Sequence, residues 1–422
     1  MEIELLYGRN GLIVELPDST QVIQSQSVAG LPNESQAIRN ALGNPINCQS
    51  LSSLVHPGDN VVIVHTDITR ATPNDRLLPV IIQEIEAAGV DPAAITLLNG
   101  LSTHRAQTSA ELRQMLGDRL VDGYHCIQHS AFDEASLVEL GQTSYGHPVR
   151  INRTYMEADV RILTGFIEPH FFAGFSGGPK AVLPSLTGVE SVLTNHSIDF
   201  ISHPKATWGV TSGNPVWEEM KEVALRTEPT FLVNVTLNRD QAITGVFAGE
   251  MVAAHEAGTQ FIHQHNMVPV DQLFDIVVTT NSGYPLDQNL YQSVKGMSSA
   301  AQIVKPGGAI IIAAACEDGL PEHGQYAKLL RKSGSLPGLL DMLAQPEFSA
   351  PDQWQVQIQA QIQQRADVYV YAEGLSDEQI RAALFIPCCD IFKRVIHLTE
   401  IYGPQASIAV LPEGPLNVAY LT

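Results

Sequence analysis

The sequence has few positive charges for its size, and this shortage limits the partners that the protein can attract. Its 422 residues contain 24 Lys and Arg against 45 Asp and Glu, which gives a formal net charge of -21. The electrostatic field of such a chain repels nucleic acid and anionic membrane surfaces. An anionic small molecule would have to be attracted by a local group of cations, so each Arg or Lys beside a motif is informative.

Cysteines and long apolar runs are also scarce. The five cysteines are odd in number and form no CxxC pair, which argues against a disulfide framework and favours a reducing compartment. The longest apolar block, Ala309 to Cys316, is far shorter than the ~20 residues that cross a bilayer. The N-terminus is acidic and does not read as a signal sequence. We therefore expect a soluble, cytoplasmic protein with no membrane or nucleic-acid partner.

Short runs rich in Val and Ile alternate with helix-period segments such as Leu77–Ala88. This alternation predicts an α/β fold with mostly parallel sheets. The alternating residues Met1–Leu16, with Asn10-Gly11 at the turn, predict an N-terminal β-hairpin, and the spacing of Gln353–Gln364 suits an amphipathic helix. The apolar runs are Val61–Val64, Ile95–Leu98, Val160–Leu163, Ile276–Val278, Ile310–Ala314, Val368–Tyr371 and Ile408–Leu411.

The length exceeds what one core usually supports, so we expect two α/β domains. The polar stretch His263–Asn266, followed by Pro269, suggests the boundary. The predicted domains are therefore residues 1–268 and 269–422, with the active site in the cleft between them.

Polar residues directly follow several of the predicted strands, where open α/β sheets bind their ligands. His104 and His170 each follow such a strand, and imidazole is the side chain best suited to proton exchange near neutral pH. Arg70 and Lys295 lie at two further strand ends, where they could hold a carboxylate. Ordinary surface salt bridges are the alternative for these two cations.

The segment Glu168–Lys180 is the most distinctive motif. Gly174, Gly177 and Gly178 would allow backbone amides to approach an anion, and Lys180 adds a charge. Pro179 and Ala181 exclude a Walker P-loop, and a tight loop with a surface lysine is the alternative.

Three further histidines are candidate metal ligands. His196 could be a metal ligand or a structural residue. His125 and His129 have the spacing of a helical metal pair, although a solvated helix face is favoured for them.

Over nearly its whole length the chain resembles the nickel-dependent lactate racemase family. Gly283–Met297 and the Glu168–Lys180 motif are long and specific. The matching segments are Asp67–Pro73, Thr103-His104-Arg105, Phe166–Leu183, Asn195-His196-Ser197, Gly283–Met297 and Pro351–Trp354. Family members usually carry Arg at the position of Pro179 and have fewer residues between the glycine and the histidine of Gly100–His104.

The resemblance implies a cofactor, pyridinium-3-thioamide-5-thiocarboxylic acid mononucleotide (the nickel pincer nucleotide), attached covalently to Lys180. Ser176, Gly177 and Gly178 would lie beside it and His196 would ligate the nickel. The N-terminal domain would carry this tether together with His104 and His170 as the acid/base pair. The C-terminal domain would contribute to substrate binding, and cofactor-biosynthesis proteins would be needed for maturation. The implied substrate-binding residues are Arg70, Lys295, Tyr291, Gln292, Asp67 and Trp354.

The expected function is that of a racemase or epimerase that interconverts the stereoisomers of a small 2-hydroxy acid by hydride transfer, with lactate as the default substrate. A 2-hydroxy-acid dehydrogenase is an alternative, but the sequence has no GxGxxG dinucleotide fingerprint. A carrier or sensor that binds the nickel pincer or a carboxylate without turnover is another, although it would need neither His104 nor His170.

Overall fold

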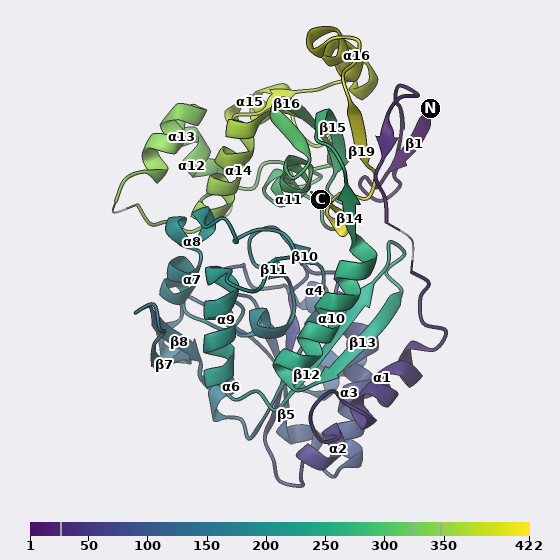
Figure 1. Ribbon diagram of the computed structural model, residues 1–422. Helices are drawn as coiled ribbons and strands as arrows, with labels where there is room; N and C mark the ends of the chain where they lie inside the picture. Colours follow the sequence, from purple (N-terminus) through teal and green to yellow (C-terminus); the bar gives the residue numbers. More distant parts are fainter. Residues whose placement is uncertain (26–27, 323, 347) are drawn as a thin grey trace. The chain divides into compact units, whose positions relative to one another are not determined.

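The computed structural model describes residues 1–25, 28–322, 324–346 and 348–422, and the chain divides into two compact units (Figure 1). Unit 1 contains Met1–Gln26, His196–Ser202 and His265–Thr422, and unit 2 contains Ser27–Asn195 and His203–Gln264. The domain limits 1–268 and 269–422 remain a prediction.

Unit 2 is built on a six-stranded sheet in the order β13-β12-β9-β4-β5-β6, parallel except for the β12–β13 pair. The central strand β4 is buried over most of its length, which accounts for its continuous apolar run. The strands are β4 (Val61–Thr66), β5 (Ile95–Gly100), β6 (His125–Gln128), β9 (Val160–Phe166), β12 (Phe231–Leu237) and β13 (Ile243–Gly249).

Helices and two short antiparallel pairs complete unit 2. The pairs are β7 (Leu137–Gln142) with β8 (Pro148–Asn152), and β10 (Pro169–His170) with β11 (Gly174–Phe175). The helices are α1 (Glu34–Gly43), α2 (Leu51–Leu54), α3 (Asn74–Ala87), α4 (Ser109–Leu116), α5 (Asp118–Gly123), α6 (Arg153–Glu157), α7 (Val189–Asn195), α9 (Pro215–Arg226) and α10 (Met251–Asn266), whose last residues belong to unit 1.

Unit 1 contains a second six-stranded sheet, in the order β18-β17-β16-β15-β19-β3, and every pair in it is parallel. Its strands are β3 (Gln21–Val22), β15 (Phe274–Thr280), β16 (Val304–Ala313), β17 (Ala366–Tyr371), β18 (Ile386–Pro387) and β19 (Ile408–Leu411). The hairpin β1 (Glu2–Leu5) with β2 (Leu12–Glu15) and the parallel pair β14 (Met267–Val270) with β20 (Val418–Leu421) are separate from it.

The helices of unit 1 are α8 (Ile198–Ser202), α11 (Leu290–Ala301), α12 (Tyr326–Ser333), α13 (Leu336–Leu343), α14 (Gln353–Arg365), α15 (Asp377–Ala382) and α16 (Ile391–Tyr402). Figure 1 shows α12 and α13 beside α14, with which both are in contact.

The predicted α/β class, the parallel sheets and the N-terminal hairpin are confirmed. The seven apolar runs fall on strands of the two six-stranded sheets, with Ala314 just beyond the end of β16. The glutamine-rich stretch is helical, but the amphipathic interpretation is wrong for its first two turns. Gln353, Gln355, Gln357 and Gln359 are all buried there, because their amides find hydrogen-bond partners inside the protein.

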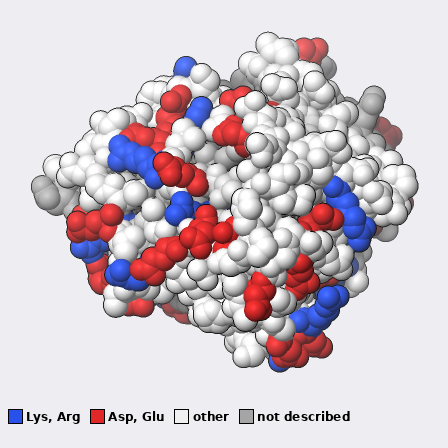
Figure 2. Space-filling view, turned by 90° about the horizontal axis from the view of Figure 1, so that it is seen from below, with Lys and Arg blue, Asp and Glu red and all other residues white. Residues whose placement is uncertain are grey.

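Acidic and basic side chains are mixed over the face of the molecule drawn in Figure 2. No helix within the described ranges is both long and apolar enough to cross a membrane.

Candidate active site

The predicted site residues of unit 2 lie beyond the carboxyl ends of three neighbouring strands. In the parallel sheet, β4 lies between β5 and β9. Asp67 follows β4, the loop that carries His104 follows β5, and the segment that carries His170 follows β9. Ligands of open α/β sheets bind beyond such strand ends, so these side chains lie where the fold favours chemistry.

Asp67 and His104 form a histidine–carboxylate pair. Oδ2 of Asp67 is hydrogen-bonded to Nδ1 of His104, and Oδ1 accepts from the amide (3.0 Å) and the hydroxyl (2.6 Å) of Thr69. Burial alone would raise the pKa of the Asp67 carboxyl, but His104, Arg70 and Thr69 together hold that pKa well below its usual range. An ionised Asp67 favours a proton on Nδ1 of His104, which leaves Nε2 as the nitrogen that can accept one.

His170 is held in a different way. Its ring is 3% exposed, and Nδ1 accepts a hydrogen bond from the backbone amide of Ala173 at 3.2 Å. The rings of Phe171 and Phe172 pack against it, with centroid distances of 4.8 and 4.6 Å. Because Nδ1 is an acceptor, the proton of a neutral His170 ring is carried by Nε2.

Lys180 lies in the short 3-10 helix η3 (Gly178–Ala181). Its ammonium is 6.0 Å from the centroid of Phe172, whose ring also packs against His170. Pro179 occupies an early position of η3, where its fixed φ and missing N–H are tolerated. The predicted tether and one predicted catalytic histidine therefore share a neighbour.

Ser185 connects Lys180 with the loop that leads to His104. The hydroxyl of Ser185 donates to the carbonyl oxygen of Lys180 at 2.8 Å. The carbonyl oxygen of Ser185 accepts from the amide of Ser102 at 3.0 Å, two residues before His104. The structure thus brings the surroundings of His104, His170 and Lys180 together within unit 2.

Two residues that sequence reasoning missed hold the glycine loop. The amide of Gly178 donates to Oδ1 of Asn234 at 2.8 Å, and the carbonyl oxygen of Ser176 accepts from Nε2 of His255 at 2.9 Å. A Cβ on Gly178 would come within 2.5 Å of the His255 ring. Burial lowers the pKa of His255 to about 4. Asn234 and His255 are distant from the loop in sequence, so no local pattern signals them.

Gly174–Gly178 also fits the G-x-S-x-G pattern of serine hydrolases, and the structure argues against that chemistry. Ser176 is 7% exposed. Its hydroxyl accepts from the amide of Glu168 at 2.9 Å and donates to the carbonyl oxygen of Phe166 at 3.0 Å. These bonds show that the Ser176 hydroxyl stabilises the loop and is not an exposed nucleophile.

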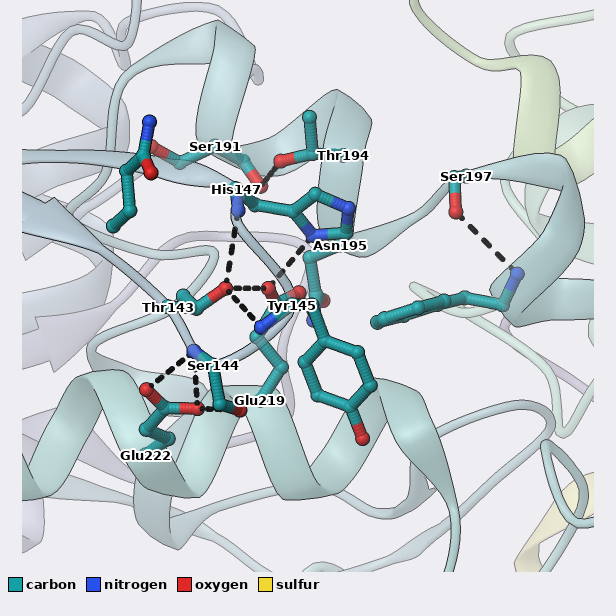
Figure 3. A network of polar contacts seen from close by, with 12 residues as sticks. Thr143, Ser144, Tyr145, His147, Ser191, Thr194, Asn195, Ser197, Glu219 and Glu222 are labelled. Carbon is teal, nitrogen blue, oxygen red and sulfur yellow. Dashed lines mark hydrogen bonds and ion pairs between the residues drawn. The ribbon is translucent and has the colours of Figure 1, made fainter.

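A second histidine–carboxylate pair lies elsewhere in unit 2 (Figure 3). Glu219, 1% exposed on α9, accepts at Oε1 from the Thr143 hydroxyl and is bonded there to Nδ1 of His147, both at 2.7 Å. Its Oε2 accepts from the side-chain amide of Asn195 at 2.9 Å. The network therefore holds the residue that precedes His196, and its members are too far apart in sequence for spacing to reveal it.

In unit 1, His196, Trp354 and Tyr291 are neighbours. His196 is 3% exposed, and its ring centroid is 5.1 Å from that of Trp354. The indole Nε1 of Trp354 donates to the Tyr291 hydroxyl at 3.1 Å. Lys295 lies one turn after Tyr291 on α11 and is 5% exposed, and Gln292 is on the same helix.

The alternative pair His125 and His129 is not helical. His125 is an exposed residue of β6, whereas His129 is buried and its Nε2 donates to the carbonyl oxygen of Thr187 at 3.1 Å. The prediction of a solvated helix face is therefore wrong for His129, whose pKa burial lowers to about 4. Among the residues that the structure describes, no three His, Cys, Asp or Glu side chains are grouped to hold a metal ion.

Each unit is built on a mostly parallel six-stranded sheet, and histidines follow the carboxyl edge of one of these sheets. These features are typical of an α/β enzyme. Residues 7–209 match the family model of the lactate racemase N-terminal domain, and residues 270–418 match that of the lactate racemase C-terminal domain. The chain belongs to the lactate racemase family, and the family's named members are isomerases.

Named relatives match over the full length. The lactate racemase of Thermoanaerobacterium thermosaccharolyticum is 33% identical over 98% of this chain and 97% of its own. That of Lactiplantibacillus plantarum is 33% identical over 98% of both chains. The structure of the lactate racemase apoprotein from T. thermosaccharolyticum has a TM-score of 0.91 at 32% identity, covering 99% of this chain and 100% of that one. A Thermotoga maritima protein, 18% identical with a TM-score of 0.71 over 95% of this chain and 100% of its own, shares the fold.

Proposed function

We propose that this protein is a lactate racemase that uses a nickel pincer nucleotide attached to Lys180. The full-length similarity to lactate racemases supports the reaction. The observation that carries the mechanism is the pair of differently held histidines beyond one sheet edge of unit 2. Nδ1 of His104 is bonded to Asp67, which makes its Nε2 the proton acceptor, whereas Nδ1 of His170 accepts from a backbone amide, which puts the ring proton on Nε2.

The residues present suit this cofactor. The imidazole of His196 is a nitrogen ligand of the kind that nickel accepts, and the amine of Lys180 can form an amide-type bond. No three His, Cys, Asp or Glu side chains among the described residues are grouped for a metal ion, so the organic pincer would have to supply the other nickel ligands. When bound, the cofactor would supply the acceptor and donor of hydride at the substrate Cα.

The two histidines would handle the hydroxyl proton. Removing the Cα proton itself would place a carbanion beside a carboxylate, whereas loss of hydride from Cα together with the hydroxyl proton gives a planar keto acid. Nε2 of His104 is ready to take the proton of one isomer, and Asp67 stabilises the resulting imidazolium. The Nε2–H of His170 would hydrogen-bond to the substrate oxygen from its own side and stabilise the negative charge there as hydride returns. The proton held by His104 would then pass to that oxygen, so that both histidines regain their starting protonation states.

The cationic side chains would fix the substrate. The guanidinium of Arg70 can form a bidentate hydrogen bond with a carboxylate, and the ammonium of Lys295 offers a point charge. Tyr291, Gln292 and Trp354 would complete the binding surface for the rest of the acid. The expected location of the active site between the two predicted domains belongs to this proposal.

A chirality assay of the nickel-loaded protein across a panel of 2-hydroxy acids tests the reaction. We expect interconversion of D- and L-lactate in both directions without stoichiometric pyruvate. Pyruvate in amounts equal to consumed lactate would instead indicate a dehydrogenase. No turnover of any acid by protein that carries nickel and the cofactor would indicate a carrier or sensor.

Two variants and a mass measurement test the assigned roles. His104→Ala and His170→Ala should each lower turnover by ~10²–10⁴ while nickel stays bound, because each removes an acid/base group and not a ligand. Intact-mass analysis should find the adduct on Lys180, and an unmodified chain in an active preparation would contradict the tether.

A further inference from the structure

The first turns of α14 contain four glutamines whose side chains are buried. Gln353, Gln355, Gln357 and Gln359 are at most 4% exposed. Burying a side-chain amide is unfavourable unless its hydrogen bonds are made. The partners of these amides therefore indicate what the helix holds in place.

Two of them hold the segment that contains His196. Gln353 and Gln357 are four residues apart and so lie on one side of α14. Nε2 of Gln353 donates to the carbonyl oxygen of His196 at 3.2 Å. Nε2 of Gln357 donates to the carbonyl oxygen of Ile198 and to the hydroxyl of Ser202, both at 2.9 Å. Residues 196–202 are thus bound to α14 at both ends.

The same turn of α14 also contacts the ring of His196 and holds Tyr291. The ring of Trp354 meets the ring of His196 nearly edge-on, at an interplanar angle of 70°. Nε2 of Gln355 donates to the carbonyl oxygen of Tyr291, and Trp354 donates to the Tyr291 hydroxyl. The Gln353 amide is itself fixed, because its Oε1 accepts from the amide of Ala350 at 2.9 Å.

We propose that Gln353 and Gln357 are positioning residues for His196, the nickel ligand of the proposed function on which this inference rests. Neither needs to touch nickel. Each holds a carbonyl of the segment whose first residue supplies the imidazole, and Trp354 limits the tilt of the ring. Groups that orient a ligand in this way typically change metal affinity by 10–100-fold when they are removed.

The test measures how fast the nickel-loaded protein releases nickel to excess EDTA. Gln357→Met keeps the length and apolar stem of the side chain. It also removes Oε1, which has no hydrogen-bond partner among the described residues, so the variant should fold. We expect nickel release to be ~10–100-fold faster than in the unchanged protein, with the Lys180 adduct mass, the KM for lactate and kcat per bound nickel unchanged within about twofold. Gln353→Met should act in the same direction.

Gln363→Met is the matched control, because Gln363 lies on the same helix and donates to the carbonyl oxygen of Leu384 at 2.5 Å, away from residues 196–202. It should release nickel at the unchanged rate although it also loses a hydrogen bond to a carbonyl. Equal release rates in the Gln357 and Gln363 variants would overturn the positioning role. His196→Ala separates the two hypotheses: if it releases nickel no faster than the unchanged protein, the ligand assignment fails first.

Discussion

The His104–Asp67 and His147–Glu219 pairs of unit 2 have nearly the same design. In one, Nδ1 of His104 is bonded to Asp67, which also accepts from the Thr69 hydroxyl. In the other, Nδ1 of His147 is bonded to Glu219, which also accepts from the Thr143 hydroxyl. The histidine side chains are 30% and 25% exposed and the carboxylates 3% and 1%. Geometry of the pair alone therefore cannot identify a catalytic histidine.

The surroundings distinguish the two pairs. Asp67 follows directly from β4 at the carboxyl edge of the sheet, where α/β folds bind ligands. Glu219 lies on α9, and its second oxygen is taken by the amide of Asn195. We infer that the first pair serves the reaction, whereas the second holds the β7–β8 hairpin and the end of α7 to α9.

Asp67→Asn should have the largest effect. An amide cannot stabilise the imidazolium of His104 and no longer favours the proton on Nδ1, so we expect turnover of the nickel-loaded protein to fall by ~10³, or about 4 kcal/mol of transition-state stabilisation. Racemisation rates in both directions measure it. Asp91→Asn is the control, because Asp91 accepts from an amide two residues later, as Asp67 does, but outside the site. A loss below tenfold would contradict the role of Asp67.

Glu219→Gln should affect stability instead. The change leaves buried donors of Thr143 and Asn195 facing a neutral amide, so we expect about 3 kcal/mol of lost unfolding free energy. Urea unfolding measures it, and turnover per bound nickel should stay within a few-fold. Glu222→Gln, on the same helix with a more exposed carboxylate that accepts from Ser144, should cost less than about 1 kcal/mol. If the Glu219 variant lost turnover as the Asp67 variant does, the two pairs would share a function.

The two pairs also explain what the sequence could predict. The strands follow from runs of Val and Ile such as Val61–Val64, because apolar periodicity is a local property. His104 and His170 could be singled out because each follows such a strand. Glu219 and His255 could not, since their importance arises from contacts with residues more than seventy positions away, such as Glu219 with His147 and His255 with Ser176. The amphipathic interpretation of α14 was wrong for the same reason, because the hydrogen-bond partners of its buried glutamines are distant in sequence.

His255 differs from both paired histidines, because it is bonded to a backbone carbonyl oxygen and not to a carboxylate. Its pKa is about 4 in the folded protein against 6.5 for an exposed ring. Between these values the unfolded chain binds a proton that the folded protein does not, so stability falls as pH falls from 6.5 to 4. His255→Gln, which can still donate to Ser176, should reduce this slope by one proton, about 1.4 kcal/mol per pH unit. Urea unfolding across this range measures it, and an unchanged slope would place the proton uptake elsewhere.

The smallest expected effects come from the two threonines, and they sharpen the comparison most directly. Thr69→Val and Thr143→Val each remove one hydroxyl bond to a buried carboxylate at similar volume, worth about 1 kcal/mol. If the pairs differ in function, loss of the hydroxyl should change turnover in one variant and stability in the other. Thr69→Val should lower turnover about fivefold, because a less restrained Asp67 orients His104 less well. Thr143→Val should lower the unfolding free energy by about 1 kcal/mol and leave turnover unchanged. Each variant serves as the control for the other, and equal losses of turnover in both would show that surroundings do not separate the two pairs.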